Sequence, residues 1–244
     1  MPDSVPHQAV PMSRLPRHLA ALVLSLACCF ATAHAAEPSL QDALSKLAPQ
    51  ANPKVIGLAL AATECASAQG QPPSDRLAVI DYSKPSTEPR LWVFDLARRK
   101  LLYHELVAHG RNTGDNLATK FSNTPESLQS SLGLFRTLGT YAGRNGYSLR
   151  MEGLEPGTND HALARALVIH GAAYVNSAFA RQQGRIGRSY GCPAVRNAIA
   201  RPLIDTLKGG QYVFSYYPDA RWLSTSPYLK CGSGRAMTAS LNAP

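Results

Sequence analysis

Apolar residues follow two patterns along this chain, and each pattern predicts a different kind of element. Short apolar or alternating runs bounded by turn residues predict β-strands at 77–82, 90–96, 101–108, 134–138, 147–152, 167–170 and 211–216. Runs with helical spacing predict helices at 54–65, 161–166, 174–182 and 195–207. Strands outnumber helices, so we expect a mostly β protein with inserted helices, of the α+β class.

The helix at 54–65 belongs to a helical N-terminal subregion. Asn52 and Pro53 suit the cap and first-turn positions of that helix. A segment rich in Gly, Pro and Ser then ends the subregion. We expect a helical subregion with its linker at 36–74, a main domain at 75–220 and a C-terminal tail at 221–244. Within the main domain, the charged turn 98–100 between two strands predicts a β-hairpin.

The first 35 residues have the composition of an export signal. Arg14 and Arg17 precede an apolar run at 19–30, and an A-x-A pattern ending at Ala35 follows it. The run is shorter than the roughly 18 to 20 apolar residues of a membrane-spanning helix, and no other stretch approaches that length. We therefore expect cleavage near Ala35, export to the periplasm or cell envelope, and no integral membrane anchor.

The formal net charge of +9 favours an anionic partner. Nucleic acid, a lipid surface and a cell wall rich in carboxylates and phosphates all fit that sign. Export argues against nucleic acid, and no basic run is interleaved with aromatic residues. An equally simple reading is that the charge only aids solubility.

Cysteine parity separates one thiol from the others. Cleavage of the leader would remove Cys28 and Cys29 and leave Cys65, Cys192 and Cys231. An odd number of cysteines in an oxidising compartment leaves at least one without an internal partner. A disulfide between Cys65 and Cys231 is a candidate that spacing alone cannot establish. Cys192 would then be the free thiol.

Cys192 also has the residues around it that a nucleophilic thiol needs. A cysteine attacks as its thiolate, and a histidine can take the thiol proton and later return it to a leaving amine. His170 ends an apolar strand and can act as that base, oriented through a backbone carbonyl such as that of Gly171. We expect the start of helix 195–207 and the charge of Arg188 to lower the thiol pKa. Gly191 would offer an unobstructed N–H to an oxyanion hole.

These residues resemble the catalytic signature of the L,D-transpeptidase family, often called the YkuD domain. Its His-Gly pair and Ser/Thr-His-Gly-Cys motif are similar to His170-Gly171 and Ser189-Tyr190-Gly191-Cys192, and its Gly-x-Phe strand is similar to 130–135. The resemblance covers roughly 78–217. It implies a β-sandwich fold, Cys192 as nucleophile, His170 as base, and Ser189 and Gly191 beside the oxyanion pocket. Tyr190 stands where the family usually has His, which indicates a divergent, murein-acting branch.

The resemblance implies peptidoglycan stem peptides as substrate, carbapenems as inhibitors, and no cofactor. We also expect no metal site, because no His or Cys pair has the close spacing of zinc ligands. Substrate carboxylates could meet any of several arginines, or these could be solvated surface charges: Arg111, Arg144, Arg150, Arg185 and, most favoured, Arg188. The segment that begins at His109 could be a second functional patch or only a turn.

Two other functions fit the same residues. The thioester formed on Cys192 could be hydrolysed by water, which would make the protein an L,D-carboxypeptidase. A non-catalytic wall-binding module, in which Cys192 pairs with Cys65 or Cys231, is the alternative from another class.

Overall fold

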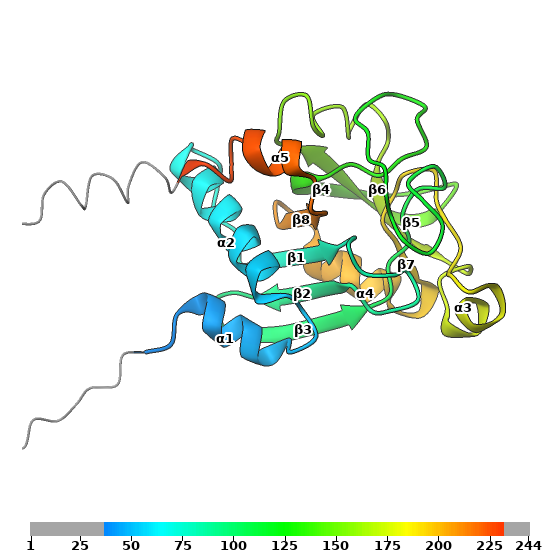
Figure 1. Ribbon diagram of the computed structural model, residues 1–244, viewed down its shortest axis with the longest axis horizontal. Helices are drawn as coiled ribbons and strands as arrows, with labels where there is room; N and C mark the ends of the chain where they lie inside the picture. Colours follow the sequence, from blue (N-terminus) through cyan, green and yellow to red (C-terminus); the bar gives the residue numbers. More distant parts are fainter. Residues whose placement is uncertain (1–36, 232–244) are drawn as a thin grey trace, which may run out of the picture. The chain divides into compact units, whose positions relative to one another are not determined.

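A computed structural model describes residues 37–231 of the chain. The expected leader at 1–35 and residues 232–244 of the expected tail lie outside the described residues. Within the described part, eight strands form one sheet in the order β3-β2-β1-β8-β4-β5-β6-β7 (Figure 1). Their bounds are β1 Arg76–Asp81, β2 Leu91–Asp95, β3 Lys100–Glu105, β4 Gly133–Gly143, β5 Gly146–Gly153, β6 Val168–Ala172, β7 Ala194–Arg196 and β8 Tyr212–Tyr216.

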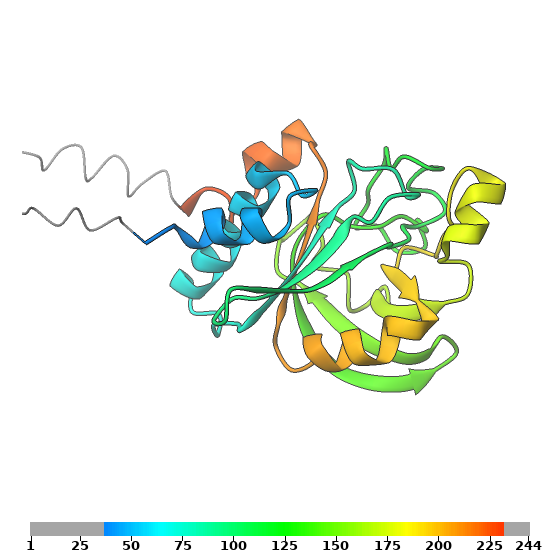
Figure 2. The same ribbon diagram turned by 90° about the horizontal axis from the view of Figure 1, so that it is seen from below.

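The sheet is mixed, and it confirms the expected class of a mostly β protein with inserted helices. The β1–β8 and β6–β7 pairs are parallel, and the other neighbouring strands are antiparallel. The β2–β3 pair is the hairpin predicted from the charged turn. Figure 2 shows that the sheet curls strongly. An antiparallel bridge between Ala108, just beyond β3, and Ala194 in β7 joins the two ends of the sheet, so it is nearly a barrel.

Helices cover both faces of the central strands. The helices are α1 Leu40–Leu47, α2 Pro53–Ala68, α3 Ser177–Gln183, α4 Asn197–Leu207 and α5 Ala220–Thr225. α2 contacts β1, β4 and β8, whereas α4 contacts β1, β5, β6 and β7. Figure 2 shows α2 and α4 on opposite sides of the sheet. This is why β1, β2 and β8 are almost entirely buried and read as continuous apolar runs.

The helix expected at 54–65 is α2, and it begins where the sequence predicts. The Asn52 side chain accepts a hydrogen bond of 2.9 Å from the backbone N–H of Lys54, and Pro53 occupies the first turn. Two expected helices begin later than predicted. α3 starts after its cap at Asn176, and α4 starts at Asn197 because Val195 pairs with Gly171 in the β6–β7 ladder.

The helix expected at 161–166 is wrong. That segment forms hydrogen-bonded turns, and Ala166 has φ of 52°, a left-handed conformation that ends any helix there. The expected tail at 221–244 contains part of a helix that the sequence did not predict, α5. Its Trp222 packs 5.8 Å from the Phe214 ring and donates to the carboxylate of Glu155.

A disulfide joins Cys65 in α2 to Cys231, with 5.5 Å between their Cα atoms. Cys192 is the free cysteine of residues 37–231. The pairing on which the wall-binding alternative depended is therefore absent. Within this part of the chain, no helix is both long and apolar enough to cross a membrane.

Candidate active site

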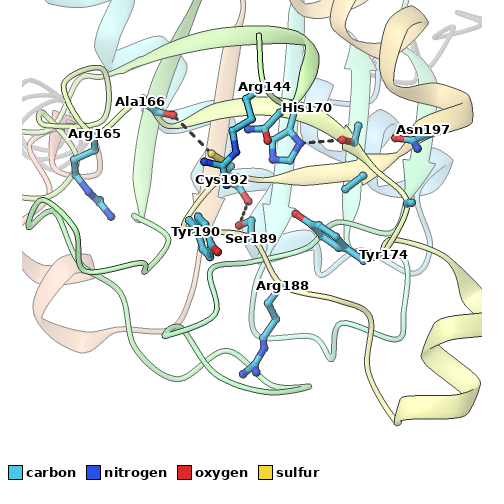
Figure 3. Close-up of a pocket in the computed structure, with 14 residues that line it drawn as sticks. Arg144, Arg165, Ala166, His170, Tyr174, Arg188, Ser189, Tyr190, Cys192 and Asn197 are labelled. Carbon is cyan, nitrogen blue, oxygen red and sulfur yellow. Dashed lines mark hydrogen bonds between the residues drawn. The ribbon is translucent and has the colours of Figure 1, made fainter.

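A cavity of about 680 Å³ opens where β6, the segment that leads into β7 and the tip of the β4–β5 hairpin meet. His170 and Cys192 both line it, and Figure 3 shows the two side chains beside each other in the cavity. The other lining residues are Arg144, Asn145, Arg165, Ala166, Gly171, Ala172, Ala173, Tyr174, Arg188, Ser189, Tyr190 and Asn197. The sheet thus brings together two residues that lie 22 positions apart in the sequence.

Cys192 ends a tight turn that its own residues hold together. The Ser189 hydroxyl donates to the Cys192 carbonyl at 2.6 Å and accepts from the Gly191 N–H at 3.1 Å. Gly191 has φ of 122°, and a Cβ there would lie 2.8 Å from the Gln129 carbonyl oxygen, so glycine is required. The Gly191 N–H, expected to be unobstructed, is therefore already engaged by Ser189.

Ser130 ties this turn to the strand segment beside it. Its hydroxyl donates to the Gly191 carbonyl at 2.9 Å and accepts from the Gly110 N–H at 3.0 Å. A Cβ on Gly110 would lie 2.9 Å from Gly191 Cα and meet the Leu128 carbonyl. The resemblance drew attention to 130–135, but nothing in the sequence assigned this contact to Ser130.

The Cys192 thiol is buried, and burial is the main influence on it. Its sulfur lies 3.5 Å from the Val168 amide nitrogen and 3.7 Å from the Ala166 carbonyl oxygen. Burial raises the thiol pKa, and the Val168 N–H and the charge of Arg165 oppose that rise only in part. The expected lowering by a helix N-terminus is wrong, because β7 separates Cys192 from α4.

His170 is held in β6 with one nitrogen fixed. Its Nδ1 lies 2.9 Å from the Gly171 carbonyl oxygen, the partner expected from the sequence. A carbonyl can only accept, so Nδ1 carries the proton and the lone pair of the neutral ring is on Nε2. Burial lowers the His170 pKa, which keeps the ring neutral. Gly171 itself packs closely against α4, where a Cβ would lie 2.9 Å from Ala200 Cβ.

Arg188 lines the cavity but is bound to the protein. Its guanidinium Nη1 lies 2.7 Å from the Asp115 carboxylate and donates to the carbonyls of Arg111 and Gly114. Arg111 does not line the cavity, and its Cζ lies 5.9 Å from the ring centroid of Tyr190. Tyr190 is 60% exposed at the cavity mouth. Arg150 and Arg185 also lie outside the lining.

His109 is held inside the protein and does not line the cavity. His109 is fully buried, with Nδ1 2.7 Å from an Arg90 guanidinium nitrogen and Nε2 3.3 Å from the Gly114 carbonyl oxygen. Arginine can only donate, so Nδ1 accepts and Nε2–H donates to Gly114. Burial and the Arg90 charge lower the His109 pKa to about 4. The ring is therefore neutral and braces the loop that carries Asp115.

Two cavity residues were not predicted as functional. Arg165 donates to Ser122, Ser127, Gln129 and Ser131 and is the positive charge that acts on the thiol. Tyr174 lies in the cavity with a pKa raised to about 12 by burial and by Cys192, so its hydroxyl stays protonated. Each lies within five positions of His170, but no motif or spacing distinguished them. No group of His, Cys, Asp and Glu within residues 37–231 could hold a metal ion.

Comparisons with known proteins give one family and several distant structures. A family described as "L,D-transpeptidase catalytic domain" matches residues 47–216. No curated protein matches the sequence. Among solved structures, an L,D-transpeptidase from Mycobacterium smegmatis is 14% identical with a TM-score of 0.38, and L,D-transpeptidase 1 from Mycobacterium tuberculosis is 11% identical with a TM-score of 0.33.

The aligned part is limited in both of these structures. It covers 59% of this chain in each case, and 60% and 63% of the respective relatives. An L,D-transpeptidase from Stackebrandtia nassauensis is 12% identical with a TM-score of 0.35, over 73% of this chain and 90% of that one.

Proposed function

Because the chain belongs to the family of L,D-transpeptidase catalytic domains, we propose that it is an exported cysteine acyltransferase that remodels the peptide stems of peptidoglycan. The observation that carries the proposal is the cavity in which the free thiol of Cys192 and the neutral imidazole of His170 lie together. Three arginines line the same cavity, which suits a substrate rich in carboxylates.

Acylation begins with a protonated thiol, because burial raises the Cys192 pKa. As sulfur attacks the carbonyl that joins an L-centre to the terminal D-residue, His170 Nε2 takes the thiol proton. The tetrahedral oxyanion then collapses, the C–N bond breaks, and the imidazolium gives its proton to the leaving amine. A thioester on Cys192 remains.

Two donors are available to the oxyanion. The backbone N–H of Cys192 lies beside its own sulfur, where it already favours the thiolate. The Tyr174 hydroxyl lines the cavity and stays protonated at neutral pH. Gly191 is left out of this set because its N–H donates to Ser189.

In the second half-reaction the amine of another stem attacks the thioester. His170 accepts the amine proton, the C–S bond breaks, and the thiolate recovers that proton from the imidazolium. Hydrolysis is a second candidate, since no aspartate or glutamate lines the cavity to bind the ammonium form of an acceptor. Water would then take the place of the amine.

The test is acylation of the purified protein by a carbapenem, followed by intact mass. We expect the mass of one adduct on the wild-type protein and none on Cys192→Ala. Tetrapeptide stems with and without an amine donor then separate the two reactions, because only the transferase yields a cross-linked product. A carbapenem adduct that persists in Cys192→Ala, or no adduct and no peptide turnover in the wild type, would overturn the proposal.

A further inference from the structure

The charge of the cavity is one-sided. Arg144, Arg165 and Arg188 line it, and among residues 37–231 no aspartate or glutamate does. Such a site attracts a carboxylate and repels an ammonium group. In the proposed reaction, the terminal carboxylate of the acyl donor therefore suits the cavity better than the ammonium form of the acyl acceptor does.

Two of the three arginines are already committed to the protein. The Arg165 guanidinium donates four hydrogen bonds of 2.6 to 3.0 Å to residues 122–131. Arg188 is paired with Asp115 and also donates to two backbone carbonyls. Their hydrogen bonds hold the cavity wall, and a ligand would have to compete with protein acceptors for either side chain.

Arg144 is different in both position and contacts. It lies in the two-residue turn between Gly143 at the end of β4 and Gly146 at the start of β5. It is exposed, and no hydrogen bond or ion pair joins it to any residue of 37–231. Figure 3 shows its side chain among the cavity residues, and it lines the same cavity as Cys192 and His170. Its fork of N–H donors is therefore available to a ligand at the reacting centre.

We propose that Arg144 determines specificity by binding the α-carboxylate of the terminal residue that leaves during acylation. The inference rests on the proposed function. In a terminal residue, that carboxylate is three bonds from the carbonyl carbon that Cys192 attacks, so it must lie in the same cavity as the thiol. A guanidinium binds a carboxylate through two parallel hydrogen bonds.

This assignment has a direct consequence for substrate choice. The enzyme acts on the last residue of a stem and not on internal bonds, because an internal residue has an amide where Arg144 needs a carboxylate. An uncharged amide offers one acceptor oxygen and no charge, so the bidentate pair is lost.

The experiment compares two tetrapeptide stems that differ only in a free or an amidated C-terminus, with release of the terminal residue as the readout. We expect the wild-type protein to prefer the free carboxylate by about 10- to 100-fold in kcat/KM, as loss of a charged pair implies. In Arg144→Gln the preference should fall to near unity, and Arg144→Lys should keep part of it. Arg201→Gln is the matched control, because Arg201 is exposed, stacks 4.2 Å from the Tyr147 ring centroid and does not line the cavity.

Binding to the inert Cys192→Ala protein separates this inference from the proposed function. If the wild type releases the residue but Arg144→Gln keeps the same preference, the inference is overturned and the function stands. If no peptide is turned over, yet Cys192→Ala binds the carboxylate form more tightly and adding Arg144→Gln removes that difference, the proposed function fails while carboxylate binding by Arg144 stands. Equal binding of both peptides overturns it.

Discussion

At the scale of single residues, the Cys192 thiol and the His170 imidazole are both neutral at rest. Burial raises the pKa of the Cys192 thiol and lowers the pKa of the His170 imidazole, so each group favours its uncharged form. A resting thiolate–imidazolium pair would need the opposite shifts. In the proposed reaction the proton must therefore move during attack, so we assign His170 the role of general base and not only that of a partner to a preformed thiolate.

This resting state predicts the pH dependence of Cys192 alkylation by iodoacetamide. Only the thiolate reacts, so the rate should keep rising with pH beyond about 8.5, the ordinary thiol pKa. Substrate acylation needs neutral His170, so it should persist below about pH 6.5 and fall only as the pH passes through the lowered histidine pKa. An alkylation rate that is already at its plateau near neutral pH would contradict the neutral pair.

Arg165 predicts a second effect on the same thiol. Its charge lowers the Cys192 pKa, and its four hydrogen bonds hold the loop whose Gln129 carbonyl lies against Gly191. In Arg165→Gln the alkylation curve should shift to higher pH, whereas Arg165→Lys, which keeps the charge, should stay near the wild-type curve. Both variants should lose about 1.5 kcal/mol or more of unfolding free energy with the hydrogen bonds. Coincident curves for the two variants would mean that the charge does not act on the thiol.

At the scale of elements, the turn that carries Cys192 depends on the segment that follows β3. The Ser189 N–H donates to the His109 carbonyl, the Arg111 N–H donates to the Ser189 carbonyl, and Gly110 packs against Gly191. The thiol is thus positioned by backbone contacts between segments about 80 positions apart. A parallel β-bridge between Gly110 and Ser189 is one of these contacts.

We predict that Gly110→Ala destabilises this contact. The added Cβ would meet the Leu128 carbonyl and Gly191 Cα, and such overpacking costs about 1 to 3 kcal/mol. Carbapenem acylation should slow at the same time, because the turn cannot keep its position. Gly139→Ala is the control, since nothing lies within 4 Å of its Cβ and Gly139 is exposed on β4. Urea unfolding measures the loss of stability, and intact mass measures the rate of acylation. If Gly110→Ala changes neither, the turn that carries Cys192 does not depend on this contact.

Most strands could be predicted because their signal is local. β1, β2 and β8 are apolar runs bounded by turn residues, and they lie within two positions of the expected ranges. β7 could not be predicted, because the residues from Val195 onward have a helical pattern. Only their pairing with β6 makes Ala194–Arg196 a strand. The turn at 161–166 could not be predicted for a similar reason, since Arg165 donates to Ser122, in a loop 43 positions away.

The site divides in the same way. His170, Cys192 and the glycines beside them could be identified because a motif carries them. Arg165 and Arg144 could not be ranked, because an arginine's role depends on which acceptors surround it in space. Arg188 is the opposite case. Its nearness to Cys192 in the sequence favours it as a substrate-binding residue, but its pairing with Asp115 is visible only in three dimensions.

At the scale of the whole molecule, the disulfide links the first long helix to the end of the described chain. Cys65 and Cys231 are 166 positions apart, so the bridge closes a loop that contains the entire sheet. A loop of this length restricts the unfolded chain strongly, and removal of such a bridge typically costs about 2 to 5 kcal/mol.

We predict a matching loss of unfolding free energy in the double variant Cys65→Ser, Cys231→Ser, measured by urea denaturation. Alkylation of Cys192 should be unchanged, because neither cysteine of the bridge lines the cavity. Wild-type protein measured in excess reductant is the control and should approach the double variant. Equal midpoints for oxidised and reduced wild type would show that the bridge does not restrain the chain.

The bridge between Ala108 and Ala194 has a consequence for how a peptide can be recognised. β7 is the last strand of the sheet, and on its outer side the Ala194 carbonyl already accepts a hydrogen bond from the Ala108 N–H. A guest peptide therefore cannot pair with β7 at Ala194 as an additional strand, the mode by which many proteins bind extended L-peptides. Binding through a cavity and side chains does not require the ligand's backbone to pair with a strand. A peptide of alternating chirality, which cannot form a regular ladder, can therefore bind in this way.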